Sequence, residues 1–567
     1  MRFGIRLGRR TLRLPLALLA LGIGLARPPQ ASAQAWPGFS RDPQHTGVSL
    51  VASQYPQQVR WSTPVDLNPQ YSSDGSLLTH YGSPLITSGN TVLIPVKLDA
   101  YGGFRIEARE GSTGKLIWQL GSSYQFPVTG WNWIPVWGPT LRPNDKSLAY
   151  PDAGGIVRIR PNPDSSSGFA IRQAFYGLAN YRRNPQAFHQ AIQICTPLTS
   201  DAEGNLYFGF YSTGAALPGY EQGIPSGLAR LSRWGQGTFV AARLLSGDAR
   251  FDKIAYNCAP ALSNDGSSVY IAVNSGAWSP GYLCRVDSFT LEPQGRVFLI
   301  DPKDGGGASI SNSSTASPTV APDGDVYYGV LERRFGSNNA RGWLLHYNAT
   351  LTAAKTPGAF GWDDTASIVP ASAVPSYTGD SSYLLLTKYN NYANWGIGGD
   401  GRNRLAILDP NGTQIDPISG VTVMREVLTI LSPTPEPELG DQAVREWCIN
   451  SAAVDPLGRC AIVNCADGNV YRWDFATNTL SDPVNLAPPT GEAYTTTLVG
   501  PDGAIYAINN AVLNCCEARP DTSFPGALES LAGAGEEGTA GTDNRPGANR
   551  ERILNLRDGK RTVRIRK

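Results

Sequence analysis

The sequence is short of the residues and motifs on which most hydrolytic and metal-dependent catalysis depends. It has four histidines and two methionines in 567 residues, and it contains no GxSxG, Walker A or HExxH motif. Neither a CxxCH haem site nor paired CxxC zinc spacing occurs. No long amphipathic helix is evident. A glycosidase remains an alternative, because its two catalytic carboxylates can come from segments far apart in the sequence, but no motif identifies such a pair.

Charge is also scarce in the body of the chain. Charged residues make up 17% of the sequence, and the formal net charge is +1. The first 33 residues carry +6 and residues 545–567 about +7, whereas residues 514–544 carry about −5 and residues 34–513 about −7. An acidic body disfavours nucleic-acid binding, which needs clustered Lys and Arg to displace counterions from phosphates.

The first 33 residues have the form of a cleaved export signal. An Arg-rich start precedes an apolar run at 14–26, and the small-residue sequence ASA follows at 31–33. The apolar run is too short to span a bilayer. The sequence GRRTLR at 8–13 resembles a twin-arginine signal, so either the Sec or the twin-arginine route is open. We therefore expect a periplasmic or secreted protein.

Glycine (62), proline (43) and tyrosine (24) are abundant, which favours turn-rich β structure. A strand, turn, strand pattern such as ASPTVAPDGDVYYGV at 316–330 recurs eight times, with anchors at Pro84, Pro139, Pro197, Pro260, Pro318, Ser372, Ala452 and Thr496. Their mean spacing, about 59 residues, is typical of propellers and other repeat folds. A second strand pair follows several hairpins, as expected for four-stranded blades. We predict an all-β, single eight-bladed β-propeller of antiparallel blades, in which the strand at 59–65 completes the last blade and closes the ring.

The segment AWPGFSRDPQHTG at 35–47, the SPxxxxDGxVY hairpins and GSTGKLIW at 111–118 resemble the PQQ-like repeat propellers. This resemblance covers residues 35–510. It implies the eight-bladed fold, and the family includes quinoprotein alcohol dehydrogenases and a periplasmic scaffold of outer-membrane protein assembly. Fold likeness does not carry function with it. The domain prediction is a signal peptide at 1–33, a propeller at 34–513, and a low-complexity linker and basic tail at 514–567, expected to be disordered.

Ligand recognition in a propeller is expected where the loops that enter each innermost strand meet the loops between second and third strands. The candidate ligand-binding face comprises His80, Tyr81, Trp133, Trp137, His189, Gln193, Asn257, Lys388, Tyr389, Asn390, Asn391, Tyr392, Trp395, Arg445, Glu446, Trp447 and Tyr494. In the alternative interpretation, each aromatic side chain packs between blades, and each polar side chain forms hydrogen bonds with backbone groups at the end of a strand.

Residues 388–404 are predicted to be an insertion between the second and third strands of the sixth blade. Its aromatic residues suit stacking on a flat ligand or a sugar. Asp400 and Asn403, in a Gly-rich turn, are candidate Ca²⁺ ligands, although this turn lacks the several carboxylates of a dedicated calcium loop. A structured insertion without a ligand is the alternative.

Eight cysteines in an exported chain favour disulfides. If DPLG at 455–458 is a four-residue turn, Cys448 lies opposite Cys465 and the two are predicted to bond. A bridge between Cys195 and Cys258, at matching positions of neighbouring repeats, is a further prediction. Cys515 and Cys516 are expected to follow the final blade, either cross-linking to other molecules or pairing with Cys284 or Cys460.

The sequence favours an exported, non-catalytic binding or scaffold module for a periplasmic or extracellular protein, peptide or glycan, monomeric and without a cofactor. The alternative is a PQQ- and calcium-dependent quinoprotein dehydrogenase. In that family a disulfide of adjacent cysteines lies over the cofactor, whereas Cys515 and Cys516 come late in this chain. The basic tail is expected to lie on an anionic envelope surface, to contact another chain, or to be solvated without a partner.

Overall fold

The computed structural model describes residues 1, 35–71, 73, 75, 77–78, 81–100, 102–125, 137–276, 278–310, 316–486 and 496–520, except the side chain of Trp395. The predicted signal peptide beyond residue 1 and the predicted tail beyond residue 520 lie outside the described residues. Residues 35–519 form one unit. The described residues contain three α-helices, namely α1 (Leu178–Arg183), α2 (Pro185–Ala191) and α3 (Ala242–Ser246). No helix among these residues is long and apolar enough to cross a membrane.

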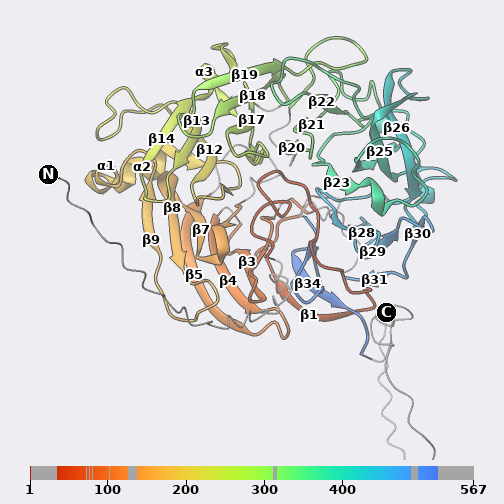
Figure 1. Cartoon of the computed structure of the whole chain (residues 1–567), viewed down its shortest axis with the longest axis horizontal. Coiled ribbons are helices and arrows are strands. Elements are labelled where there is room, and N and C mark those ends of the chain that lie inside the picture. The colour runs from red at the N-terminus through yellow and green to blue at the C-terminus, as the bar shows by residue number, and fades with distance from the viewer. Residues whose placement is uncertain are drawn as a thin grey trace, which may run out of the picture. The chain divides into compact units, whose positions relative to one another are not determined.

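Eight antiparallel sheets are arranged in a ring, which confirms the eight-bladed propeller (Figure 1). Blade 1 contains β2 (Leu85–Ile86), β3 (Thr91–Lys97), β4 (Gly102–Glu110) and β5 (Leu116–Gln125). Blade 2 contains β6 (Thr140–Leu141), β7 (Ser147–Asp152), β8 (Ile156–Pro161) and β9 (Ile171–Ala174). Blade 3 contains β10 (Ile192–Ile194), β11 (Thr199–Ser200), β12 (Leu206–Ser212), β13 (Gly227–Leu231) and β14 (Gly237–Ala241). Blade 4 contains β15 (Lys253–Ile254), β16 (Ala261–Leu262), β17 (Ser268–Asn274), β18 (Gly281–Asp287) and β19 (Pro293–Phe298).

The second half of the ring repeats this plan. Blade 5 contains β20 (Thr319–Val320), β21 (Val326–Val330) and β22 (Trp343–Tyr347), with isolated bridges from Gly358 and Ala354 in place of a fourth strand. Blade 6 contains β23 (Ser367–Pro370), β24 (Tyr383–Tyr389), β25 (Arg404–Ile415) and β26 (Thr422–Leu431). Blade 7 contains β27 (Ala453–Asp455), β28 (Cys460–Asn464), β29 (Asn469–Asp474), β30 (Thr479–Leu480) and β31 (Val484–Asn485). Blade 8 contains β32 (Leu498–Val499), β33 (Ile505–Asn509), β34 (Val512–Glu517) and the N-terminal strand β1 (Gln58–Pro64).

The ring is closed as the sequence predicts. Strand β1 pairs antiparallel with β34, with Trp61 opposite Cys515 and Thr63 opposite Leu513. On the inner side, the hydroxyls of Ser83 in blade 1 and Thr496 in blade 8 lie 2.6 Å apart. Strand β1, which comes from the opposite end of the chain, is therefore the outermost strand of blade 8 and covers the edge that β34 would otherwise expose.

The short segment before β1, residues 36–49 and hereafter the channel segment, runs inside the ring (Figure 1). Trp36, Ser40 and His45 are buried in it. Burial lowers the pKa of His45 to about 4, so this imidazole is neutral at pH 7. The segment therefore fills the channel as part of the core, a role that its sequence did not predict.

The two faces of the ring differ in their connections. The loop face carries the loops between second and third strands, such as 332–342 and 390–403, and the connections between blades. The turn face carries the tight turns that join first to second and third to fourth strands, such as 201–205 and 232–236. The predicted insertion is confirmed on the loop face, because β24 ends at Tyr389 and β25 begins at Arg404.

Candidate functional site

Five of the predicted site residues come together on the loop face, between blades 6 and 7. Lys388 and Asn390 lie at the end of β24, Tyr392 in the insertion, and Glu446 and Trp447 in the connection to β27. The Asn390 amide donates to the Trp447 carbonyl at 3.1 Å and accepts the Trp447 backbone N–H at 3.3 Å. This reciprocal pair fixes the insertion to the next blade.

Buried charges line the same region. The Thr387 hydroxyl donates to the Asp364 carboxyl, and both side chains are buried. Burial raises the pKa of Asp364 to about 7, although the nearby Lys388 ammonium favours its charged form. Burial also raises the pKa of Glu446, again opposed by Lys388. The Lys388 ammonium thus attracts both carboxyl groups, and this attraction helps to hold the loops together.

Replacing Asp364 by Asn is expected to increase the free energy of unfolding at pH 8 by up to about 4 kcal/mol, and hardly at all at pH 4. The folded-state pKa of Asp364, about 7, lies above the ordinary value of 3.8. Between these values the unfolded chain has lost a proton that the folded chain keeps, so stability falls as the pH rises. Urea denaturation across this range measures the effect, with the exposed Asp482→Asn as control. Equal pH slopes for the wild type and Asp364→Asn would contradict the assignment.

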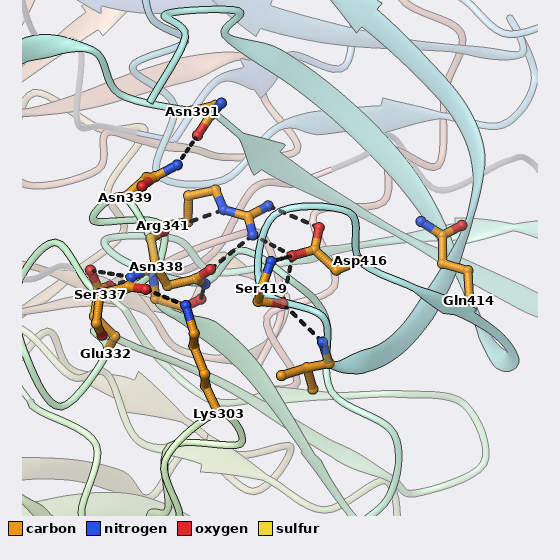
Figure 2. Close-up of polar contacts among 12 residues, drawn as sticks. Lys303, Glu332, Ser337, Asn338, Asn339, Arg341, Asn391, Gln414, Asp416 and Ser419 are labelled. Atoms are coloured by element: carbon orange, nitrogen blue, oxygen red, sulfur yellow. Dashed lines mark hydrogen bonds and ion pairs between the residues drawn. The ribbon is translucent and has the colours of Figure 1, made fainter. Parts of the chain in front are cut away.

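A second buried network holds the loop between β21 and β22 (Figure 2). Both carboxylate oxygens of Glu332 accept backbone N–H groups of this loop, those of Gly336 and Ala340 at Oε1 and that of Gly342 at Oε2, at 2.8–2.9 Å. Arg341 donates to Asp416, at the tip of the hairpin formed by β25 and β26, at 2.5 Å. Both partners are about 1% exposed, so the pair is sealed from solvent.

The two loops are also joined to each other. The Asn339 amide donates to the Asn391 side chain at 2.8 Å. Within the insertion, the Asp400 carboxylate accepts from the Asn391 amide at 2.6 Å and from the Arg402 N–H at 2.9 Å. Residues 332–342 and 390–403 therefore form one rigid surface.

The predicted calcium ligands are committed to this loop structure. The Asn403 side chain accepts the Asn391 N–H at 3.0 Å and donates to the Val444 carbonyl at 2.8 Å. No group of three or more His, Cys, Asp or Glu side chains gathers as a metal site in the part of the chain that the structure describes. Calcium binding by Asp400 and Asn403 stays a prediction.

Most of the predicted aromatic residues pack inside the ring. Trp137, Tyr389, Tyr392 and Trp447 are all at most 5% exposed, which matches the packing interpretation. Gln193 and Asn257 belong to blades 3 and 4, away from the cluster between blades 6 and 7, and the Gln193 amide donates to the Gln125 carbonyl. His80, Trp133 and Tyr494 lie outside the described residues, as does the side chain of Trp395.

Other side chains of the loop face are exposed, and the sequence did not single them out. Trp278 is 40% exposed and Phe335 52% exposed, and Arg333 beside Phe335 is also accessible. Trp278 adopts a positive φ of 58°, which is uncommon for a bulky residue. The sequence signal that could have found them is an aromatic residue within a loop between second and third strands.

The predictions of disulfides within the chain are wrong. The structure describes all eight cysteines, and each is a buried thiol. In blade 7, Asp455 pairs with Cys460, so the turn is Pro456–Arg459 and not 455–458. Arg459 takes a left-handed φ of 49°, which places the turn one residue later and removes the register that set Cys448 opposite Cys465. The Cys465 thiol instead donates to the Glu446 carbonyl at 3.4 Å.

The expected position of Cys515 and Cys516 is also wrong. They do not follow the last blade but lie within it, in β34, opposite Tyr506 and Ile505. Burial raises the pKa of Cys515 to about 12 and also raises that of Cys516. As neighbours on one strand they point to opposite sides of the sheet.

Comparisons with known proteins find structural likeness only. No protein-family description matches the sequence. No curated protein matches either. Among solved structures, a europium-containing methanol dehydrogenase is 8% identical, with a TM-score of 0.49 over 84% of this chain and 89% of its own. BamB from Moraxella catarrhalis is 10% identical (TM-score 0.43; 81% and 100%), and Saccharomyces cerevisiae Sqt1 is 11% identical (0.47; 82% and 99%). Identities of this size carry no statement about activity.

The described residues do not fit a quinone cofactor of the kind that the resemblance implies. The adjacent cysteines lie as thiols within a strand of blade 8, away from the loop face. Trp137 and Trp447, the predicted site tryptophans whose side chains the structure describes, are about 1% and 0% exposed within the blade packing, so neither presents a face on which a flat ring could stack. We therefore assign no reaction step to such a group.

Proposed function

We propose that this chain is an exported, non-catalytic binding or scaffold module that captures a protein, peptide or glycan on its loop face. The observation that carries the proposal is the locked pair of loops at 332–342 and 390–403. Buried charges hold these loops in place, yet Phe335 and Arg333 of the first loop are accessible. Loops that are ordered before binding lose little conformational entropy in a complex.

The exposed side chains are of the kind that dominates binding energy at interfaces. Trp and Arg are enriched among residues whose truncation costs most affinity. Trp278 supplies such a side chain from the loop between β17 and β18, and Arg333 supplies another from the loop that carries Phe335. The groups with perturbed pKa values, Asp364 and Glu446, are occupied with Lys388 in fixing the loops. This arrangement favours recognition over acid–base chemistry.

The test is site-specific photo-cross-linking in the cell envelope of a producing cell. A benzoylphenylalanine in place of Phe335 is expected to give a discrete adduct. The same probe at Leu457, which is 68% exposed on the turn face of blade 7, is expected to give none. A Trp278→Ala change should lower the adduct yield from position 335.

The competing function makes a different prediction. Equal labelling from positions 335 and 457 would contradict recognition on the loop face. Oxidation of alcohols or aldose sugars by purified protein supplied with PQQ, Ca²⁺ and an artificial electron acceptor, above the rate of heat-inactivated protein, would establish the dehydrogenase instead.

A further inference from the structure

The channel segment bonds the innermost strands of the ring in a regular way. In each case the backbone N–H of the second residue of the inner strand donates to a carbonyl of the segment. The donor and acceptor pairs, all 2.7–3.0 Å apart, are Ile86 to Trp36, Leu141 to Pro37, Leu262 to Pro43, Val320 to Gln44, Ile368 to Thr46 and Val454 to Gly47. These bonds serve blades 1, 2, 4, 5, 6 and 7.

Blade 3 has no such bond among the described residues. The equivalent donor is the N–H of Ser200 in β11, but the segment steps from Pro37 at blade 2 directly to Pro43 at blade 4. Between them the chain makes a tight turn, with positive φ at both Ser40 and Arg41. Ser40 instead contacts Ser451 of blade 7 at 2.7 Å. The turn draws the segment away from β11.

A cavity of about 540 Å³ lies at this gap, a size typical of ligand sites. Its wall includes Ser200, with Phe39, Leu198 and Leu262 as apolar lining. Four acidic residues line it, namely Asp42, Asp201, Glu203 and Asp265, against one cation, Arg41. The cavity is therefore acidic.

Glu203 is the acidic residue available to a ligand. Asp201 and Asp265 are committed to turn hydrogen bonds, and Asp42 to Arg41 and Thr46. Glu203 is exposed and forms no ion pair with any described residue.

Glu203 also lines a second cavity of about 530 Å³ at the turn face, so the two cavities adjoin. Its walls include Trp234 and Phe289, which are 75% and 72% exposed. Arg233 lies over the Trp234 ring and Arg230 over the Phe289 ring, at 4.6 and 4.9 Å from the ring centroids. Exposed rings backed by guanidinium groups form an ordered apolar platform.

We propose that these adjoining cavities, hereafter the turn-face groove, bind an extended segment of a partner polypeptide that carries a basic side chain. A main-chain carbonyl of the guest accepts from Ser200 N–H, and so supplies the bond that the channel segment makes in the neighbouring blades. A Lys or Arg side chain pairs with Glu203, and an apolar side chain packs on Trp234 and Phe289. This site lies on the opposite face from the proposed loop-face site and is independent of it.

The choice of an extended peptide follows from the groove. The inner strands of the ring already accept an extended backbone, and backbone pairing gives affinity while side-chain pockets give specificity. The acidic lining of the first cavity favours a cationic guest side chain there through charge complementarity. In the second cavity, Arg230 and Arg233 lie over the aromatic rings, so that part of the groove suits the apolar side chain of the guest. A neutral glycan would use the aromatic platform but would leave the carboxylate of Glu203 without a cation.

The test uses a degenerate library of capped heptapeptides passed over the immobilised full-length protein. We expect captured peptides to be enriched in Lys or Arg at a fixed spacing from an apolar residue. A Glu203→Lys change should weaken binding of the best peptide about tenfold or more. Glu221→Lys is the matched control, because Glu221 is an exposed carboxylate of the same blade on the loop face.

Hydrogen exchange gives a second readout. The best peptide should slow exchange of the Ser200 amide in the wild type, whereas the loop at 332–342 should be unaffected. Capture without basic preference, the same preference in Glu203→Lys, or an unchanged Ser200 amide would each overturn the proposal. Failure of the loop-face cross-linking experiment would leave these results unaffected.

Discussion

Replacing Trp36 by Ala is expected to lower the free energy of unfolding by about 3–5 kcal/mol. Trp36 is 0% exposed and packs in the hydrophobic cluster that joins blades 1, 7 and 8, with Ile86, Ala453 and Leu498. Removing the indole loses the free energy gained by burying its apolar surface. It also leaves a cavity that the strands of blades 1, 7 and 8 cannot easily fill. This loss is a large fraction of the free energy of unfolding of a typical protein, which is only about 5–15 kcal/mol.

Chemical denaturation followed by circular dichroism measures this loss. The matched control is Trp234→Ala, since Trp234 is 75% exposed on the turn face, and we expect it to change stability by less than about 0.5 kcal/mol. If the two substitutions have similar effects, the channel segment is not part of the core.

Replacing Arg341 by Met is also expected to destabilise the protein, by about 3–5 kcal/mol at pH 7. The substitution leaves the Asp416 carboxylate buried without its guanidinium partner. Among the residues that the structure describes, Ser419 alone still donates to it, from its N–H at 2.7 Å and its hydroxyl at 2.6 Å. The double variant Arg341→Met/Asp416→Leu should be less destabilised than the sum of the single changes, because it buries no unpaired charge.

The pH dependence distinguishes this charge effect from lost packing. Burial alone would raise the pKa of Asp416, but hydrogen bonding and attraction from Arg341 outweigh it and lower the pKa below the ordinary value of 3.8. In the wild type, this contribution is present above that value and is lost as the pH falls through the folded-state pKa. Without Arg341 the carboxyl protonates more readily, so the deficit of Arg341→Met should shrink between pH 7 and pH 4. A deficit that is constant across this range would indicate packing alone.

The repeating part of the fold could be predicted because it is encoded locally. Each blade begins with a hairpin whose turn residues and alternating apolar residues lie within about 15 positions. The orphan strand before the first hairpin pointed to closure, and the gap between two hairpins located the insertion at 390–403. Local patterns of this kind also placed Lys388, Glu446 and Trp447 on one face.

The remaining features depend on contacts that no local pattern carries. The channel segment is held by main-chain bonds to strands far away in sequence, and such bonds place no constraint on side-chain type. The sequence placed Cys515 and Cys516 after the final blade because the turn into β34 uses Asn510 and Ala511, with φ of 43° and 63°, and Ala at positive φ is not a turn signal. Burial of Trp137, Tyr389 and Tyr392 likewise depends on packing between blades.

Closure of the ring by strand β1 is the central claim, and a paired cysteine substitution tests it most directly. Ser62 and Asn514 are opposite each other in the β1–β34 pair, and their side chains meet at 2.7 Å. We predict that Ser62→Cys/Asn514→Cys, oxidised in the folded state, forms a disulfide that peptide mapping under non-reducing conditions assigns to positions 62 and 514. In the single variant Ser62→Cys, no link to the native Cys515 is expected, because that side chain points to the other side of the sheet. Absence of the 62–514 disulfide, or a link from position 62 to Cys515, would contradict the closure.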